Sequence, residues 1–102
     1  MAQIHDDLIL PCGLELPNRL AKAAMTEGLA DPRNRPTPAH ERLYRRWAEG
    51  GCGLLLTGNV QVDRHHLERP GNVVIDAEPD AAMRAGLAAW SAAARAGGGR
   101  VL

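Results

Sequence analysis

The stretch from Thr37 to Thr57, TPAHERLYRRWAEGGCGLLLT, carries the strongest structural signals in the chain. Thr37-Pro38 predicts a helix start, because threonine can cap free amide groups and proline at the first helical position loses no hydrogen bond. The helix is expected to run to about Glu49, with Gly50-Gly51 as its left-handed stop. The apolar run Gly53–Thr57 is too short for a helix and predicts a strand buried on both faces, as in parallel sheets. The apolar face of the helix is expected to consist of Leu43, Tyr44, Trp47 and Ala48.

Similar elements are predicted on both sides of this stretch. A second helix is expected to start at Pro79 or Asp80 and to stop at Gly97-Gly98-Gly99. The apolar tail Arg100–Leu102 resembles a strand that has only begun, and Arg19–Ala24 is short enough to be a buried strand, although its alanines could equally start a helix. The order strand, helix, strand, helix, strand is typical of parallel βαβ units and predicts an α/β fold. The stripe of the second helix is Met83, Leu87, Trp90 and Ala94.

The remaining segments are predicted to be a hairpin and two long loops. Leu8–Leu16 should form two short strands around a type I turn at Pro11-Cys12-Gly13. Residues 26–36 and 60–76 are rich in residues that compete with regular structure, and long loops of this kind often carry function. Within the second loop, Val73–Ile75 is expected to add a short strand.

Composition excludes several classes of function. In 102 residues, 12 Lys and Arg balance 12 Asp and Glu, so no net field attracts nucleic acid or an anionic membrane. Cys12 and Cys52 match no disulfide framework, which indicates free thiols in a reducing compartment, the cytoplasm. No segment approaches the ~18 consecutive apolar residues of a membrane span. His65-His66 lacks a third ligand nearby, so no metal site is expected. Residues 1–102 are expected to belong to a single domain.

Three segments together resemble the opening of the Old Yellow Enzyme and NADH:flavin oxidoreductase family. They are Leu16-Pro-Asn-Arg-Leu20, Ala24-Met-Thr26 and Gly53-Leu-Leu-Leu-Thr-Gly-Asn59, and the resemblance covers nearly all of residues 8–102. The resemblance implies a TIM (β/α)8 barrel whose bottom is plugged by an N-terminal hairpin. Because such a barrel needs ~250 residues, residues 1–102 are expected to be an incomplete N-terminal part: the hairpin, two βα units and the start of a third strand.

The resemblance also implies a flavin site. In the family, the main chain at the positions of Ala24, Met25 and Asn59 contacts FMN, and the group at Thr26 bonds near flavin O4. A donor there stabilises the negative charge that develops when the ring accepts hydride, which gives Thr26 a catalytic role. Ala24 stands where the family usually has proline, so its backbone is less constrained. Taken by themselves, Thr26 is an ordinary turn residue and Gly58-Asn59 a common turn pair.

The activity that the resemblance implies is reduction of FMN by NADH or NADPH, followed by hydride transfer to an activated alkene such as an enone or a dienoyl thioester. The family's remaining flavin-binding and substrate-binding residues are expected beyond Leu102, so the isolated chain is expected to be inactive. Two alternatives stay open: a non-catalytic truncated barrel fragment or partner-binding piece, and another phosphate-binding barrel enzyme with an accidental match. A homo-oligomer also stays open.

Overall fold

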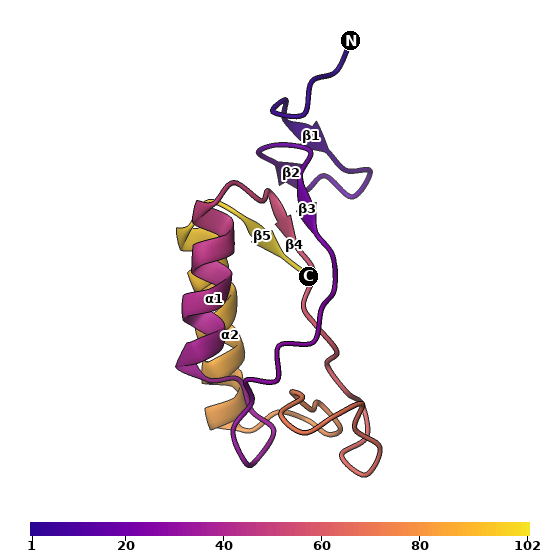
Figure 1. The fold of residues 1–102 in the computed structure, drawn as a ribbon, viewed down its shortest axis with the longest axis vertical. Helices are drawn as coiled ribbons and strands as arrows, with labels where there is room; N and C mark the ends of the chain where they lie inside the picture. Colours follow the sequence, from indigo (N-terminus) through magenta and orange to yellow (C-terminus); the bar gives the residue numbers. More distant parts are fainter.

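The computed structural model describes all of residues 1–102 and contains a small hairpin, a parallel sheet and two helices (Figure 1). The parallel sheet has the strand order β3-β4-β5, and each helix connects one of its strands to the next. The predicted order of strands and helices in the α/β unit is therefore confirmed. In chain order the elements are β1 (Leu8–Ile9), β2 (Glu15–Leu16), β3 (Ala21–Lys22), α1 (Pro38–Glu49), β4 (Leu54–Leu55), α2 (Ala81–Ala96) and β5 (Arg100–Val101).

The predicted hairpin is present at the amino ends of the parallel strands. β1 and β2 pair antiparallel with Leu8 opposite Leu16. The Gly13 N–H donates to the Leu10 carbonyl at 2.8 Å, which closes a β-turn that has Pro11 at its second position. Figure 1 shows the hairpin beyond the start of β3, while the two long loops lie at the other end of the sheet. The carboxyl ends of β3 and β4 therefore meet the loops.

Helix α1 has the predicted bounds, and Thr37 is its N-cap residue. Tyr44 and Ala48 on its predicted apolar face are buried. Leu43 and Trp47 are only half-buried, and His40, at 2% exposure, was not predicted to be in the core. The Thr37 N–H donates to His40 Nδ1 at 3.1 Å, which explains why an imidazole is tolerated there. The left-handed residue after α1 is Gly51 alone, because Gly50 keeps a helical φ of −73°.

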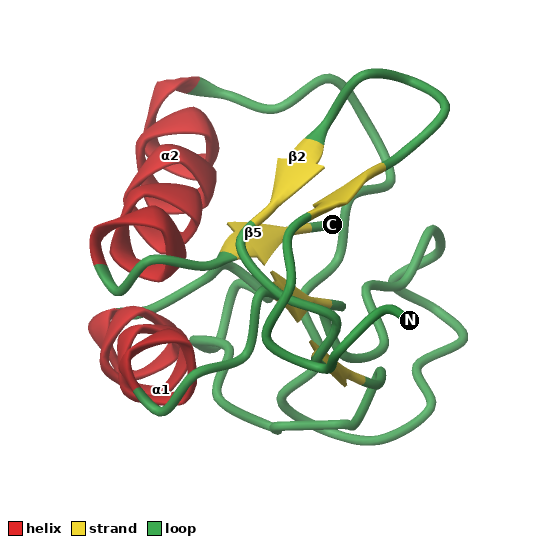
Figure 2. Cartoon of the chain, turned by 90° about the horizontal axis from the view of Figure 1, so that it is seen from above, coloured by secondary structure: helices red, strands yellow, loops and turns green.

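Helix α2 also forms as predicted, with Asp80 as its N-cap. The Met83 N–H donates to Asp80 Oδ1 at 2.8 Å, and left-handed Gly98 follows the end of the helix. Both helices lie on the same side of the parallel sheet (Figure 2). Neither helix has the length and apolar character required to cross a bilayer. The core between helices, sheet and second loop consists of Tyr44, Ala48, Leu55, Val73, Met83, Trp90 and Ala94.

Three details of the strand predictions are wrong. β3 and β4 are shorter than the predicted Arg19–Ala24 and Gly53–Thr57. Leu55 is fully buried, but Leu54 and Leu56 are half-exposed, because the helices cover only one face of the sheet. Val73–Ile75 forms no strand: Val74 makes a single bridge to Gln61, and Val73 packs into the core instead.

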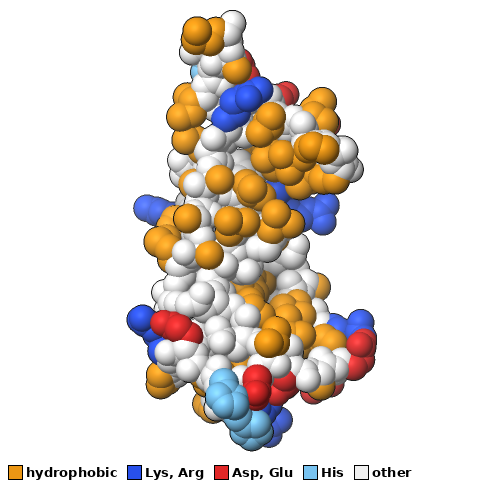
Figure 3. Space-filling view, turned by 90° about the vertical axis from the view of Figure 1, so that its right-hand side faces the viewer, with side chains coloured by type: hydrophobic (Ala, Val, Ile, Leu, Met, Phe, Trp, Pro, Cys, Tyr) orange, Lys and Arg blue, Asp and Glu red, His pale blue; other side chains and the backbone are white.

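The sheet face opposite the helices is open. Figure 3 views the molecule from that side and shows hydrophobic side chains gathered there. Several large apolar residues are exposed, including Ile9, Leu20, Met25 and Leu102. No part of residues 1–102 covers this face of the sheet. The strand within Gly53–Thr57 is therefore buried on one face only, and not on both as predicted.

Candidate functional site

The predicted site residues Thr26 and Asn59 lie side by side. β3 and β4 are parallel and in register, with Lys22 opposite Leu55, so the segments that follow them leave the sheet at the same end. The Asn59 side-chain amide donates a hydrogen bond to Thr26 Oγ1, which joins residues 33 positions apart in the sequence. The structure thus brings two of the four predicted site residues into direct contact.

The other two predicted residues, Ala24 and Met25, lie on the exposed segment between β3 and Thr26. Met25 is 50% exposed. No hydrogen bond within the chain uses the backbone N–H groups of Ala24, Met25 or Thr26. These donors are therefore free to bind a ligand.

The two segments approach so closely that residue 58 must be glycine. A Cβ on Gly58 would lie 1.7 Å from the Met25 carbonyl oxygen, far inside van der Waals contact. The turn pair Gly58-Asn59 is thus explained by packing at position 58 and by the contact with Thr26 at position 59.

Glu68 and Asn72, from the second loop, complete a polar cluster around Thr26 and were not predicted. Thr26 Oγ1 donates to Glu68 Oε2 at 3.1 Å, and Asn72 Nδ2 lies 3.5 Å from the same oxygen. Arg69 Nε donates to Glu68 Oε1 at 2.9 Å. Removal from water acts to raise the pKa of Glu68, but the hydrogen bonds from Arg69, Asn59, Thr26 and Asn72 together hold it below its usual value.

A second, buried network lies behind this cluster and was also missed. Lys22 is only 7% exposed, and its Nζ donates to the Leu56 carbonyl and lies 3.5 Å from the Tyr44 hydroxyl. The Tyr44 hydroxyl donates to Glu27 Oε1 and accepts the Gly58 N–H at 3.3 Å. Tyr44 therefore links the residue after Thr26 to the residue before Asn59.

Burial shifts the pKa values of both central groups in this network. Desolvation lowers the pKa of Lys22, against the attraction of Glu27. Desolvation and the hydrogen bond to Glu27 raise the pKa of Tyr44. The sequence signal was a single lysine inside the apolar run Arg19–Ala24, since a lysine is almost never buried without partners.

Asn18 of the Asn-Arg motif holds the opposite ends of the same strands. Its Oδ1 accepts the N–H groups of Leu20 at 3.0 Å and Gly53 at 3.1 Å, and its Nδ2 donates to the Gly51 carbonyl at 2.7 Å. Three hydrogen bonds from one side chain fix β3 against the start of β4. This part of the motif is structural.

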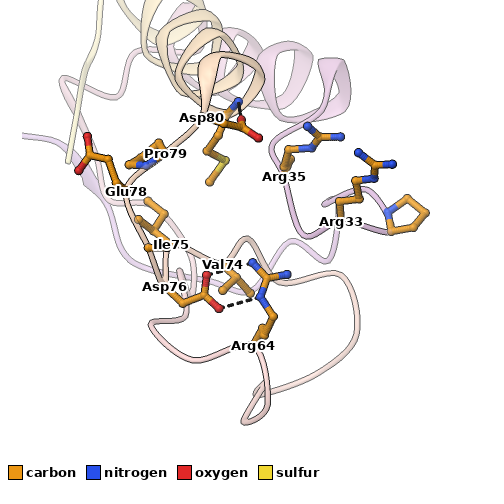
Figure 4. Close-up of a pocket in the computed structure, with 12 residues that line it drawn as sticks. Arg33, Arg35, Arg64, Val74, Ile75, Asp76, Glu78, Pro79 and Asp80 are labelled. Carbon is orange, nitrogen blue, oxygen red and sulfur yellow. Dashed lines mark hydrogen bonds and ion pairs between the residues drawn. The ribbon is translucent and has the colours of Figure 1, made fainter.

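A cleft of about 440 Å³ lies between the two long loops and the start of α2 (Figure 4). Arg33, Arg35 and Arg64 line it, but Arg64 is held by Asp76 at 2.7 Å, and Arg35 Nε lies 3.5 Å from an Asp31 carboxylate oxygen. Asp76, Glu78 and Asp80 also line the cleft, so it offers no excess positive charge for a phosphate. Thr26 and Asn59 do not line it.

No three histidine, cysteine, aspartate or glutamate side chains gather closely enough to hold a metal ion. His66 Nδ1 instead lies 2.8 Å from Asp63 Oδ2. The contacts of the histidine pair with Asp63 thus lie within the second loop.

No family model matches the chain. Among curated proteins, it is 45% identical over 78 residues to the NADH-dependent flavin oxidoreductase iliE of Hypocrea jecorina (strain QM6a), covering 74% of this chain and 20% of that protein. It is 47% identical over 81 residues to the NADH-dependent flavin oxidoreductase iccE of Talaromyces variabilis, covering 76% of this chain and 19% of that protein. The chain thus spans about a fifth of the length of these relatives.

Solved structures of longer proteins contain the same arrangement of elements. The Old Yellow Enzyme homologue NCR from Zymomonas mobilis matches 99% of this chain and 27% of its own with a TM-score of 0.81 and 19% identity. Morphinone reductase in complex with tetrahydroNAD matches 99% of this chain and 26% of its own with a TM-score of 0.80 and 23% identity. At these identities the likeness concerns the fold alone, and the relationship rests on the curated relatives. The chain therefore belongs with the NADH-dependent flavin oxidoreductases, and its fold is that of the solved Old Yellow Enzyme homologues.

Proposed function

We propose that residues 1–102 are the first part of an FMN-binding (β/α)8-barrel domain. The hairpin would close the bottom of the barrel, and β3-α1 and β4-α2 would be its first two βα units, with β5 starting the third. The position of the hairpin at the amino ends of the strands supports this assignment. The polar cluster at the carboxyl ends supports it too, because barrel enzymes place their chemistry at that end.

We propose that the whole protein is an FMN-dependent NAD(P)H oxidoreductase of the ene-reductase type. The observation that carries this proposal is the contact between Thr26 and Asn59 beside the free backbone N–H groups of residues 24–26. A flavin ring presents carbonyl oxygens and ring nitrogens at its edge, and a hydroxyl, an amide and free N–H groups are the donors that suit them. FMN would supply a ring that accepts hydride from the nicotinamide and passes it to the substrate.

The residues of this chain would bind and orient the ring. Ala24 and Met25 would offer backbone N–H groups to its edge, with Asn59 on the adjacent strand end. Thr26 would place its hydroxyl near O4, where negative charge develops on reduction, and a fixed donor at that point favours the reduced state. The four residues therefore have roles in binding and in setting the potential.

The substrate would be a small activated alkene, such as an enone or a dienoyl thioester, with NADH or NADPH as the reductant. The names of the curated relatives favour NADH. A cytoplasmic location fits the two free cysteines, one exposed and one half-buried. Assembly into a homo-oligomer remains a further hypothesis.

The test is to purify the full-length protein that carries these residues, release its cofactor by denaturation and identify it by mass. The expected result is one FMN per chain and NAD(P)H-dependent reduction of an enone. Asn59→Ala should weaken FMN retention, whereas Gln3→Ala, which removes an amide from the exposed N-terminal segment, serves as the control. A folded protein that holds no flavin would overturn this function and favour the non-catalytic alternative.

A further inference from the structure

We propose that Glu68 sets the reduction potential of the flavin at this site, by competing for the Thr26 hydroxyl hydrogen and by placing a negative charge at the carboxyl ends of β3 and β4. The proposal rests on the function proposed above. It assigns a role to a residue in the second loop that neither the motifs nor the order of strands and helices indicated.

The hydrogen bonds of Thr26 leave it no free donor. A hydroxyl has one hydrogen and two lone pairs. The Asn59 amide takes one lone pair, and the hydrogen points to Glu68 Oε2 at 3.1 Å. A ligand carbonyl can use the Thr26 donor only by competing with a carboxylate, which is the stronger acceptor. Glu68 therefore controls how strongly the Thr26 hydroxyl can donate a hydrogen bond to the negative charge that develops on the ring.

Glu68 is held in this position from its own loop. Arg69 binds its Oε1, and the buried Asn72 lies against its Oε2. Asn72 is itself fixed, because its Oδ1 accepts the Arg69 N–H at 2.9 Å and its carbonyl accepts the Asn34 side-chain amide at 3.1 Å. Hydrogen bonds within the second loop thus fix the position of the Glu68 carboxylate.

The charge acts in the same direction as the competition for hydrogen. The Glu68 side chain is 36% exposed, so solvent screens it only in part, and the Arg69 side chain that offsets it is more exposed, at 61%. A nearby negative charge disfavours the addition of electrons to the ring. Both effects make the flavin harder to reduce.

The test uses Glu68→Gln in the full-length flavoprotein, because glutamine keeps the size and removes the charge. We expect FMN to be retained and the equilibrium between oxidised and reduced flavin to shift about tenfold toward the reduced form, which is about 30 mV for a two-electron couple. The shift should shrink in a Thr26→Ala background, since part of it acts through that hydroxyl. Glu15→Gln, an equal charge change on the exposed hairpin, should leave the potential unchanged.

If Glu68→Gln loses flavin, a second variant tests whether Glu68 sets the flavin potential. Arg69→Gln removes the cation that offsets Glu68 and should shift the potential in the opposite direction, toward the oxidised form. A flavin-loaded Glu68→Gln protein with wild-type potential would overturn the role of Glu68 while leaving the flavin function intact. With Glu68→Gln unable to bind flavin, an unchanged or raised potential in Arg69→Gln would overturn it. A wild-type protein without flavin would instead overturn the proposed function.

Discussion

The side-chain amide of Asn59 donates to the hydroxyl of Thr26, so the ends of two parallel strands share one polar site. Thr26→Ala removes the hydroxyl without changing the helices or the sheet. In the full-length protein we expect a lower flavin potential and slower reduction by NAD(P)H, with a loss of about 1–3 kcal/mol from the missing hydrogen bond. Potentiometry and stopped-flow reduction measure the two effects. Thr26→Ser, which restores the hydroxyl, should recover both, and wild-type values in the alanine variant would reduce Thr26 to a turn residue.

Tyr44→Phe tests the buried network. The change leaves Glu27, Lys22 and the Gly58 N–H without their shared partner, and an unsatisfied buried group costs about 1–3 kcal/mol. We expect a lower midpoint of chemical denaturation. Equal stability of wild type and Tyr44→Phe would show that water replaces the hydroxyl.

The pH dependence of stability should include a contribution from His40. Burial is the main cause that lowers its pKa below 6.5, so as the pH falls below about 6.5 the unfolded chain takes up a proton that the folded chain does not. Stability from this group is fully present above 6.5 and is lost as the pH falls toward the lowered folded pKa, by at most about 1.4 kcal/mol per pH unit. Thermal melting of the full-length protein between pH 7.5 and 5 should be less pH-dependent in His40→Gln than in the wild type. The exposed His5 offers the matched substitution His5→Gln for comparison.

A polypeptide limited to residues 1–102 is expected to be colourless and self-associated. One face of its sheet is open, and β3 and β5 each have an unpaired edge. Sedimentation velocity at tens of micromolar should show oligomers, and circular dichroism should show helix from α1 and α2 while amide signals stay poorly dispersed. A sharp spectrum from a monomer, with one cooperative thermal transition, would establish these residues as a self-sufficient domain.

The two helices could be predicted closely because their signals are local. Thr37-Pro38 and Asp80 mark the starts, and glycines follow both ends, so neighbours in the sequence settle the bounds. The strands were predicted too long because strand length depends on pairing partners, and Leu54 shows that a continuous apolar run does not reveal which face is covered.

The contact between Thr26 and Asn59 could be anticipated because parallel strands deliver their ends to one place. The role of Glu68 could not be anticipated, because nothing in the sequence distinguishes it from other loop glutamates. Only the tertiary structure places it against Thr26, which lies 42 residues earlier in the chain. Tyr44 likewise fits an apolar helix stripe, and only the tertiary structure shows that its hydroxyl joins Glu27 to the Gly58 N–H.

Lys22 is the sole lysine of the chain, and it is buried. Apart from the amino group of Met1, residues 1–102 therefore present no accessible amine when folded, although they carry many arginines. Amine-directed acylation of Lys22, or cleavage after it by a lysine-specific protease, requires β3 to separate from α1. The rate of either reaction at Lys22 therefore measures how readily β3 and α1 separate locally, without an introduced label.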